Sequence, residues 1–258
     1  MKVKVKASRA IIYIALFIAL NYLVFAAPTG PGTLTAFNST RRTSGIDNET
    51  GGVVVQAQAG NVTALNIVST SLTDRWQGYY GNITGSITLD DAQSNSLYNW
   101  QLASPQGEIY ASNGSESGAV TWANTFCFNY TNNLSEGQNR IQRFNGTTIE
   151  SMIGASASDV DSLRSTFNGT FAGSFQVGST TISGTSGCRQ VTLFVNDAYQ
   201  STDFVEVLLT DNNSIIYTSL LEQDVTGFAG TALDFQMIVG ENGDVTTPSN
   251  YYFFVELS

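Results

Sequence analysis

The 258-residue sequence contains no histidine, and its only lysines, Lys2, Lys4 and Lys6, lie at the extreme N-terminus. The rest of the chain therefore lacks the imidazole that commonly serves as a base or metal ligand, and the amine that forms Schiff bases. Serine-histidine hydrolysis, His-ligated zinc, haem ligation through His and lysine nucleophiles are thereby excluded. The sequence also has no phosphate-binding loop followed by Lys and no dinucleotide fingerprint. We therefore expect no cofactor, no metal and no enzyme activity.

Positive charge is equally scarce. The formal net charge is −10, and beyond Arg9 only seven arginines remain against 21 acidic residues, a net charge of −14. Such a chain has no basic surface to neutralise phosphates, which argues against a nucleic-acid partner. It is also repelled by anionic lipid, so any membrane contact is expected through the N-terminal segment. The hydrophobic fraction of 42% is nevertheless that of a globular protein, and the length allows one or two domains.

The N-terminal 26 residues have the organisation of an export signal. The lysines and Arg9 precede an apolar run that begins at Ile11 and continues, interrupted by Asn21, to Ala27. A basic region, an apolar region and a small-residue exit are typical of a secretory signal, and cleavage between Ala26 and Ala27 fits its small-residue preference. We therefore predict residues 1–26 to be a signal peptide or a signal-anchor.

Two alternatives to cleavage at Ala26 stay open. The apolar run of about 17 residues is at the lower limit for crossing a bilayer, so an uncleaved anchor is one of them. The other is an archaeal-type pilin leader cut near Ala10, although Pro28 and Pro31 would end its helix early. All three place the remainder of the chain outside the cell, so we expect an extracellular or cell-surface protein.

The cysteines and the glycosylation triplets agree with export. Cys127 and Cys188 are an even pair, and a disulfide between them is the economical interpretation, with two buried free thiols as the alternative. Ten Asn-x-Ser/Thr triplets are present, although turn chemistry accounts for some of them. They begin at Asn38, Asn48, Asn61, Asn82, Asn113, Asn129, Asn133, Asn145, Asn168 and Asn212.

Apolar and polar residues alternate with period two along most of the chain, which is typical of antiparallel strands. In the first half the alternating pairs include Val53 and Val55, Leu65 and Ile67, Ile87 and Leu89, Tyr98 and Trp100, and Val120 and Trp122. The spacing predicts an all-β, sandwich-like fold of one or two β domains. We assign residues 27–52 to a stalk or linker, 53–126 to an N-terminal β domain and 127–258 to a C-terminal β domain.

The C-terminal half opens with a short helical insertion near residues 147–167. Helical character is confined to residues 147–154 and 158–167, the second starting with Ser158 and Asp161 in a spacing like that of a capping box. Strands are predicted at residues 171–177, 189–195, 204–210, 214–221, 233–239 and 251–257. The nearly continuous apolar run after Phe204 predicts a central strand buried on both faces, and Asp211-Asn212-Asn213 predicts the hairpin turn that follows it.

Carboxylates are the remaining candidates for chemistry. A glycosidase needs two of them across a cleft, and the available pairs are Asp90 with Asp91, Asp159 with Asp161, and Asp203 with Glu206. Each is better explained as a turn, a cap or a solvated strand edge. Calcium could be held by oxygen ligands from Asp90, Asp91 and Asn95 or from Glu241, Asn242 and Asp244, but neither set matches an EF-hand loop and turn chemistry explains both.

The most distinctive local string contains Trp76, Tyr79 and Tyr80, separated and followed by glycines. Such a cluster can stack on a sugar or a partner, and it is our only candidate binding site. The alternative is that these rings fill the core from one face of a strand.

Several strings resemble uncharacterised exported cell-surface β-proteins of archaea. They are residues 75–89, then Asp90-Asp91, residues 97–100, residues 107–110, residues 234–237 with 241–243, and residues 251–257. The resemblance covers most of the chain after the signal. It implies an archaeal origin and carries no assigned activity.

We therefore expect a non-enzymatic exported protein, either an envelope or filament component or a glycan- or partner-binding adhesin module, with a carboxylate glycosidase as the least favoured alternative. Self-assembly could use the polar N-terminal stretch, because residues 33–37 could add as a strand to the open sheet edge of a neighbouring copy. A plain stalk explains the same residues.

Overall fold

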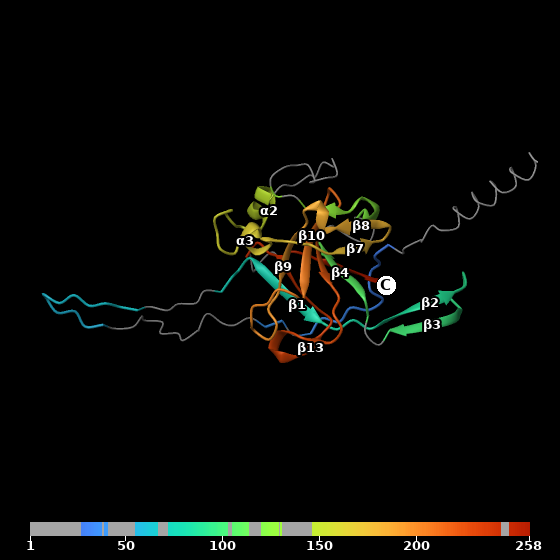
Figure 1. Ribbon diagram of the computed structural model, residues 1–258, viewed down its shortest axis with the longest axis horizontal. Helices are drawn as coiled ribbons and strands as arrows, with labels where there is room; N and C mark the ends of the chain where they lie inside the picture. Colours follow the sequence, from blue (N-terminus) through green and yellow to red (C-terminus); the bar gives the residue numbers. More distant parts are fainter. Residues whose placement is uncertain are drawn as a thin grey trace, which may run out of the picture.

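The computed structural model describes residues 27–37, 39–40, 55–66, 72–102, 105–113, 120–128, 130, 146–243 and 248–258. The predicted signal, residues 1–26, lies outside them, as do Asn38, Asn48, Asn129, Asn133 and Asn145. Within the described ranges no helix is long and apolar enough to span a bilayer. Strands dominate and pair antiparallel, which confirms the predicted all-β class (Figure 1).

The centre of the molecule is a seven-stranded antiparallel sheet in the order β15-β4-β11-β10-β9-β6, with β5 also paired to β10. Its strands are β4 (Gly107–Ser112), β5 (Phe126–Cys127), β6 (Gly169–Thr170), β9 (Arg189–Thr192), β10 (Val205–Thr210), β11 (Ile215–Leu220) and β15 (Tyr252–Leu257). Four two-stranded ribbons accompany it: β1 (Trp76–Gly81) with β14 (Phe235–Gly240), β2 (Gly85–Asp90) with β3 (Ser96–Leu102), β7 (Ser174–Val177) with β8 (Thr180–Ser183), and β12 (Val225–Thr226) with β13 (Ala232–Leu233).

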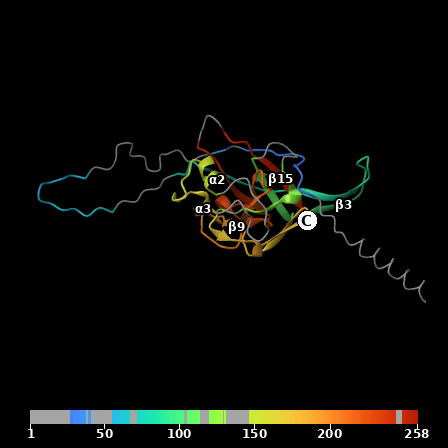
Figure 2. The same ribbon diagram turned by 90° about the horizontal axis from the view of Figure 1, so that it is seen from above.

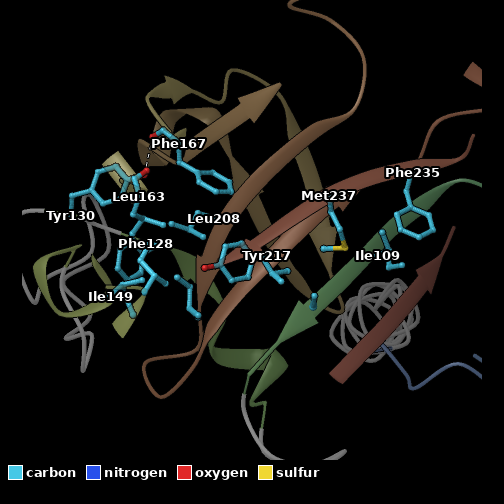
Figure 3. Packing of buried hydrophobic residues seen from close by; sticks show 14 residues of the cluster. Ile109, Phe128, Tyr130, Ile149, Leu163, Phe167, Leu208, Tyr217, Phe235 and Met237 are labelled. Carbon is cyan, nitrogen blue, oxygen red and sulfur yellow. Dashed lines mark hydrogen bonds between the residues drawn. The ribbon is translucent and has the colours of Figure 1, made fainter. Parts of the chain in front are cut away.

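Each face of the seven-stranded sheet is covered by its own apolar cluster. On β10 Leu208 belongs to one cluster and its neighbours Val207 and Leu209 to the other, as the alternation of a strand requires. The first cluster joins the sheet to β14 and the helices, with Tyr217 near its centre (Figure 3). The second joins it to the β7–β8 hairpin. The sheet is therefore the middle layer of a sandwich-like body.

Strand β10 and its turn confirm two local predictions. The strand is buried from Glu206 to Thr210 and lies between β11 on one edge and β9 with β5 on the other. The Asp211 carboxylate closes the turn to β11 by accepting from the main-chain nitrogens of Asn213 and Ser214, and Asn212 has a positive φ of 83°. Asn and Asp tolerate such turns because their short side chains hydrogen-bond the local backbone.

Cys127 and Cys188 form the predicted disulfide, with their Cα atoms 4.7 Å apart. Strands β9 and β5 follow each other along the same edge of β10: Arg189 pairs with Leu208 and Cys127 with Leu209. Continued by one residue, the register of β9 also brings Cys188 opposite Leu209. The disulfide therefore staples the junction of two short strands, and both cysteines are buried in the second cluster.

Side chains of the middle sheet hold the unpaired edge of β14. The Glu206 Oε2 atom accepts from the Ile238 nitrogen at 2.9 Å, and the Ser219 hydroxyl donates to the Gln236 carbonyl oxygen at 2.8 Å. Glu206 is fully buried, and burial raises the pKa of its carboxyl. The β1–β14 ribbon is thus attached to the sheet by directed hydrogen bonds as well as by apolar packing.

The helical insertion is present and shorter than predicted. It consists of α2 (Gly146–Met152) and α3 (Leu163–Thr166). Helix α3 begins five residues after the expected start, because the Ser162 hydroxyl, rather than Ser158, accepts from the Ser165 nitrogen as its cap. The prediction of a capping box at Ser158 and Asp161 is therefore wrong.

The described parts of three further segments that we predicted as strands form no strand. Val55 and Leu65 lie in residues 55–66, which form no strand and contain a turn in which the Asn61 nitrogen donates to the Gln58 carbonyl oxygen. Val53 and Ile67 lie outside the described residues. Residues 120–122 do not form a strand either, because Trp122 starts the 3-10 turn η1 (Trp122–Asn124). Short turns η2 (Gly184–Ser186) and η3 (Phe228–Gly230) complete the elements. Apolar alternation without a neighbouring edge to pair with does not make a strand.

The sheets cross the domain boundary that we predicted between residues 126 and 127. Strand β4, from the predicted N-terminal domain, lies between β11 and β15, and β1 pairs along its length with β14. Strands from both predicted domains therefore share one body.

The first described residues, 27–31, lie along the free edge of β15, and we call this segment the strap. Thr29 exchanges two main-chain hydrogen bonds with Val255, at 3.1 and 2.9 Å, and Pro28 is buried beside it. The pairing stops there because Pro31, at the next position that would donate, has no N–H. Residues 33–37, which we considered as an exchanging strand, are exposed and form no strand.

Candidate interaction surface

The β2–β3 hairpin projects from the body as an arm, at the end of the molecule where the C-terminus lies (Figures 1 and 2). The arm comprises residues 85–102. Its register pairs Ile87 with Trp100 and Leu89 with Tyr98, and shifts at a bulge after Leu89. Two strands alone bury little, and an isolated hairpin is marginally stable in water.

The two faces of the arm differ in chemistry. Side chains of paired residues point to the same face. One face therefore carries Ile87, Leu89, Tyr98 and Trp100, which are 40%, 50%, 58% and 49% exposed, with the two aromatic rings 4.8 Å apart. The other face presents polar pairs, such as Thr88 with Asn99. An apolar face of this kind, uncovered by the rest of the described chain, is typical of an interaction surface.

The end of the arm is a tight, acidic turn. The Asp91 carboxylate accepts from the main-chain nitrogens of Gln93 and Asn95 and from the Asn95 amide. The hydrogen bonds from Asn95 lower the pKa of Asp91. Turn formation thus accounts for the residues considered for calcium here, and among the described residues no three His, Cys, Asp or Glu side chains gather as a metal site would require.

The base of the arm is fixed to the body. The buried Asp234 carboxylate accepts from the Ile83 nitrogen at 2.7 Å, just before β2 begins. A Cβ added to Gly85 would lie 2.5 Å from the Leu257 side chain, so the two are in close contact. Beyond β3, the Gln106 carbonyl oxygen accepts from the nitrogen of Ser258. Both strands therefore leave the body beside the C-terminal end of β15.

The aromatic cluster predicted as a binding site is divided by strand β1. Trp76 packs on Phe167 and Tyr217, with ring centroids 6.0 and 6.5 Å apart, and its Nε1 donates to the Asp161 carbonyl oxygen. Tyr79 is half-buried against Phe253. Two of the three rings thus extend the core.

Tyr80 points away from that core. It is 55% exposed, and its ring centroid lies 4.9 Å from that of Phe228, which is 49% exposed. A second exposed pair is formed by Phe194 and Tyr199 at 5.8 Å. Sequence reasoning missed Phe228 as a neighbour of Tyr80 because it comes from the distant turn η3.

We expect Trp76→Ala and Tyr80→Ala to have different effects. The Trp76 change removes core contacts and a hydrogen bond, and should lower the free energy of unfolding by about 3 kcal/mol. Tyr80→Ala removes an exposed ring and should cost under about 1 kcal/mol. Urea unfolding of both variants checks this, and equal losses would contradict the division of the cluster.

The acidic pairs considered for a glycosidase have other roles. Asp159 and Asp161 both form ion pairs with Arg75. Burial raises the pKa of Asp161, but hydrogen bonds from Thr73 and Arg75 outweigh it and leave that pKa low. Glu206 lies buried beneath β14, as described above. The best-defined cavity among the described residues, about 50 Å³ between α2 and Tyr217, is lined by none of these carboxylates and has room for only a water or two.

A pair of buried carboxyls that the sequence did not single out lies at the β4–β15 pairing. Glu108 and Glu256 are direct cross-strand partners. Glu256 accepts from the Gly178 nitrogen in the β7–β8 turn, at 3.1 and 2.9 Å, and from the Tyr110 hydroxyl at 3.2 Å. Burial and the neighbouring Glu256 raise the pKa of Glu108 to about 8, and burial also raises the pKa of Glu256. The pair therefore retains a proton at neutral pH and holds the hairpin to the sheet.

Comparisons of the chain with profiles of protein families, with curated proteins and with solved structures return no match.

Proposed function

We propose that the chain is a non-enzymatic exported cell-surface protein of archaeal type, an envelope or filament component that is held by its N-terminal segment or released after cleavage. The observation that carries the proposal is the arm. An apolar face of four side chains, held out from the body, favours a protein that works by contact with another surface.

The disulfide supports the outside location. Such bonds persist in oxidising surroundings and are rare in the cytosol. Here the bond joins two short strands at a buried junction, so it belongs to the fold rather than to a redox site.

A glycan- or partner-binding adhesin is the second candidate, and the exposed pair of Tyr80 and Phe228 favours it. Exposed aromatic rings provide faces on which sugars stack. Tyr80→Ala with Phe228→Ala, tested on a glycan array, should abolish binding without loss of folding if the pair is such a site. If the variant binds glycans as well as the parent chain does, or if the parent chain binds none, the adhesin candidate is refuted and the envelope or filament component remains.

Fractionation of native cells tests the main proposal. We expect the chain in the envelope or the medium, with an oxidised disulfide, and N-terminal sequencing should show either an intact segment or a start near Ala27. Recovery in the cytosol with both thiols free would refute it.

Glycosylation, if it follows export, should distinguish the described triplets by their geometry. Asn61, Asn113 and Asn168 are exposed, whereas Asn212 is half-buried in the β10–β11 turn with its Ser214 buried. The Asn82 amide is also engaged, because its nitrogen donates to the carbonyl oxygens of Gly81 and Ala232 once oriented to satisfy both. We expect glycopeptide mass spectrometry to find the first three modified and Asn212 unmodified, and equal occupancy at Asn212 and Asn168 would contradict this.

A further inference from the structure

The position of the strap relates the arm to the part of the chain that precedes it. Thr29 pairs antiparallel with Val255, and this register directs Ala27 toward Leu257. Leu257 contacts Gly85 at the start of the arm. Ala27, the residue at which the predicted apolar run ends, therefore lies beside the base of the arm.

We propose that the apolar face of the arm rests on the outer surface of the membrane that holds the N-terminal segment, at the boundary between lipid headgroups and acyl chains. This inference depends on the proposed function, in the form in which the segment is retained. A chain anchored directly before Ala27 keeps the arm within reach of the bilayer, because the strap fixes Thr29 and Asp234 fixes Ile83.

The residues of the face suit that boundary. Trp and Tyr prefer membrane interfaces, where the ring is in an apolar layer and its N–H or O–H meets water or headgroups. Trp100 and Tyr98 lie side by side with Ile87 and Leu89 opposite them, so the face can lie flat. Thr88 and Asn99 on the other face would stay in water.

Charge selects the kind of lipid. Residues 85–102 contain no Lys or Arg, and the turn carries Asp90 and Asp91. Anionic headgroups would repel it, so zwitterionic or neutral headgroups are the partner. The arm also contains no glycosylation triplet, since the flanking ones begin at Asn82 and Asn113. Two arms packed face to face in the same direction would bring their acidic turns together, and the repulsion between these carboxylates disfavours that pairing with a second copy.

The test compares two faces of one strand. The full chain carrying Leu89→Cys or Thr88→Cys is labelled with an environment-sensitive fluorophore and reconstituted in phosphatidylcholine vesicles. We expect a blue shift and a severalfold rise in emission for the Leu89→Cys label only, with quenching by lipids brominated near the headgroup end. Tyr98→Cys against Asn99→Cys repeats the comparison on β3, should either first variant fail to fold.

Vesicle flotation separates the possible failures. If the chain floats with the vesicles but the labels on both faces show the emission of a water-exposed fluorophore, the inference is overturned. The proposal of an anchored cell-surface protein is then unaffected. If the chain does not float, anchoring itself is refuted, and the inference with it. A Leu89→Cys label that is shielded only as protein concentration rises, without quenching by brominated lipid, assigns the face to a second copy and also overturns the inference.

Discussion

Lowering the pH from about 8 to about 5 is expected to raise the free energy of unfolding by at most about 4 kcal/mol through Glu108. The folded protein holds the pKa of Glu108 at about 8, against an ordinary value of 4.5, because the carboxyl is buried beside Glu256. Between these values the folded chain binds a proton that the unfolded chain has released. The stabilisation is therefore fully present below pH 4.5 and is lost as the pH rises through 8. Urea unfolding at intervals across this range measures the slope.

Glu108→Gln provides the matched control. It keeps the shape of the side chain and removes the titration, so the variant should be more stable than the parent chain at pH 8 and should vary less with pH. Burial raises the pKa of Glu206 as well, so part of the slope should persist in the variant. A free energy of unfolding that is constant or rises between pH 5 and pH 8 in the parent would contradict the assignment.

Replacing Cys127 and Cys188 together by alanine should lower the free energy of unfolding by about 4 kcal/mol. The disulfide closes a loop across a sequence separation of 61, and this loop contains both helices and the β7–β8 hairpin. Without the bond, the unfolded chain gains the freedom of that loop. The loss is a large share of the 5–15 kcal/mol typical of a domain. Thermal unfolding of the oxidised, reduced and double-alanine forms measures it.

The reduced parent chain separates the bond from the side chains. It keeps both sulfur atoms in the second cluster, so any further loss in the alanine variant reports on packing. If reduction leaves the unfolding midpoint unchanged, the disulfide does not stabilise the junction of β9 and β5, and the prediction is wrong.

Local patterns predicted the parts of the fold in which neighbours along the chain determine the outcome. The apolar run from Phe204 gave a central strand, and Asp211-Asn212-Asn213 gave its turn, because strand burial and turn geometry depend on adjacent residues. The disulfide followed from an even count. The same reasoning failed at Val55 and Trp122, where alternation is present but no strand edge is available to pair with.

What the sequence did not reveal depends on distant partners. Glu108 and Glu256 meet only because β4 pairs with β15, a strand far from it in the sequence, and a charged residue in an apolar strand is the signal that could have identified them. The apolar face of the arm was visible as alternation at Ile87, Leu89, Tyr98 and Trp100. Alternation alone does not say whether the core, a membrane or another chain covers that face.

The proline-flanked strap on β15 has a consequence for solubility. Residues 251–257, Tyr-Tyr-Phe-Phe-Val-Glu-Leu, form an apolar segment of high β-propensity with one charge and no proline, the composition that favours aggregation when an edge is open. Thr29 occupies the middle of that edge, and Pro31 cannot extend the ladder. The strap thus occupies the middle of this edge and adds no extended strand of its own to which another chain could pair.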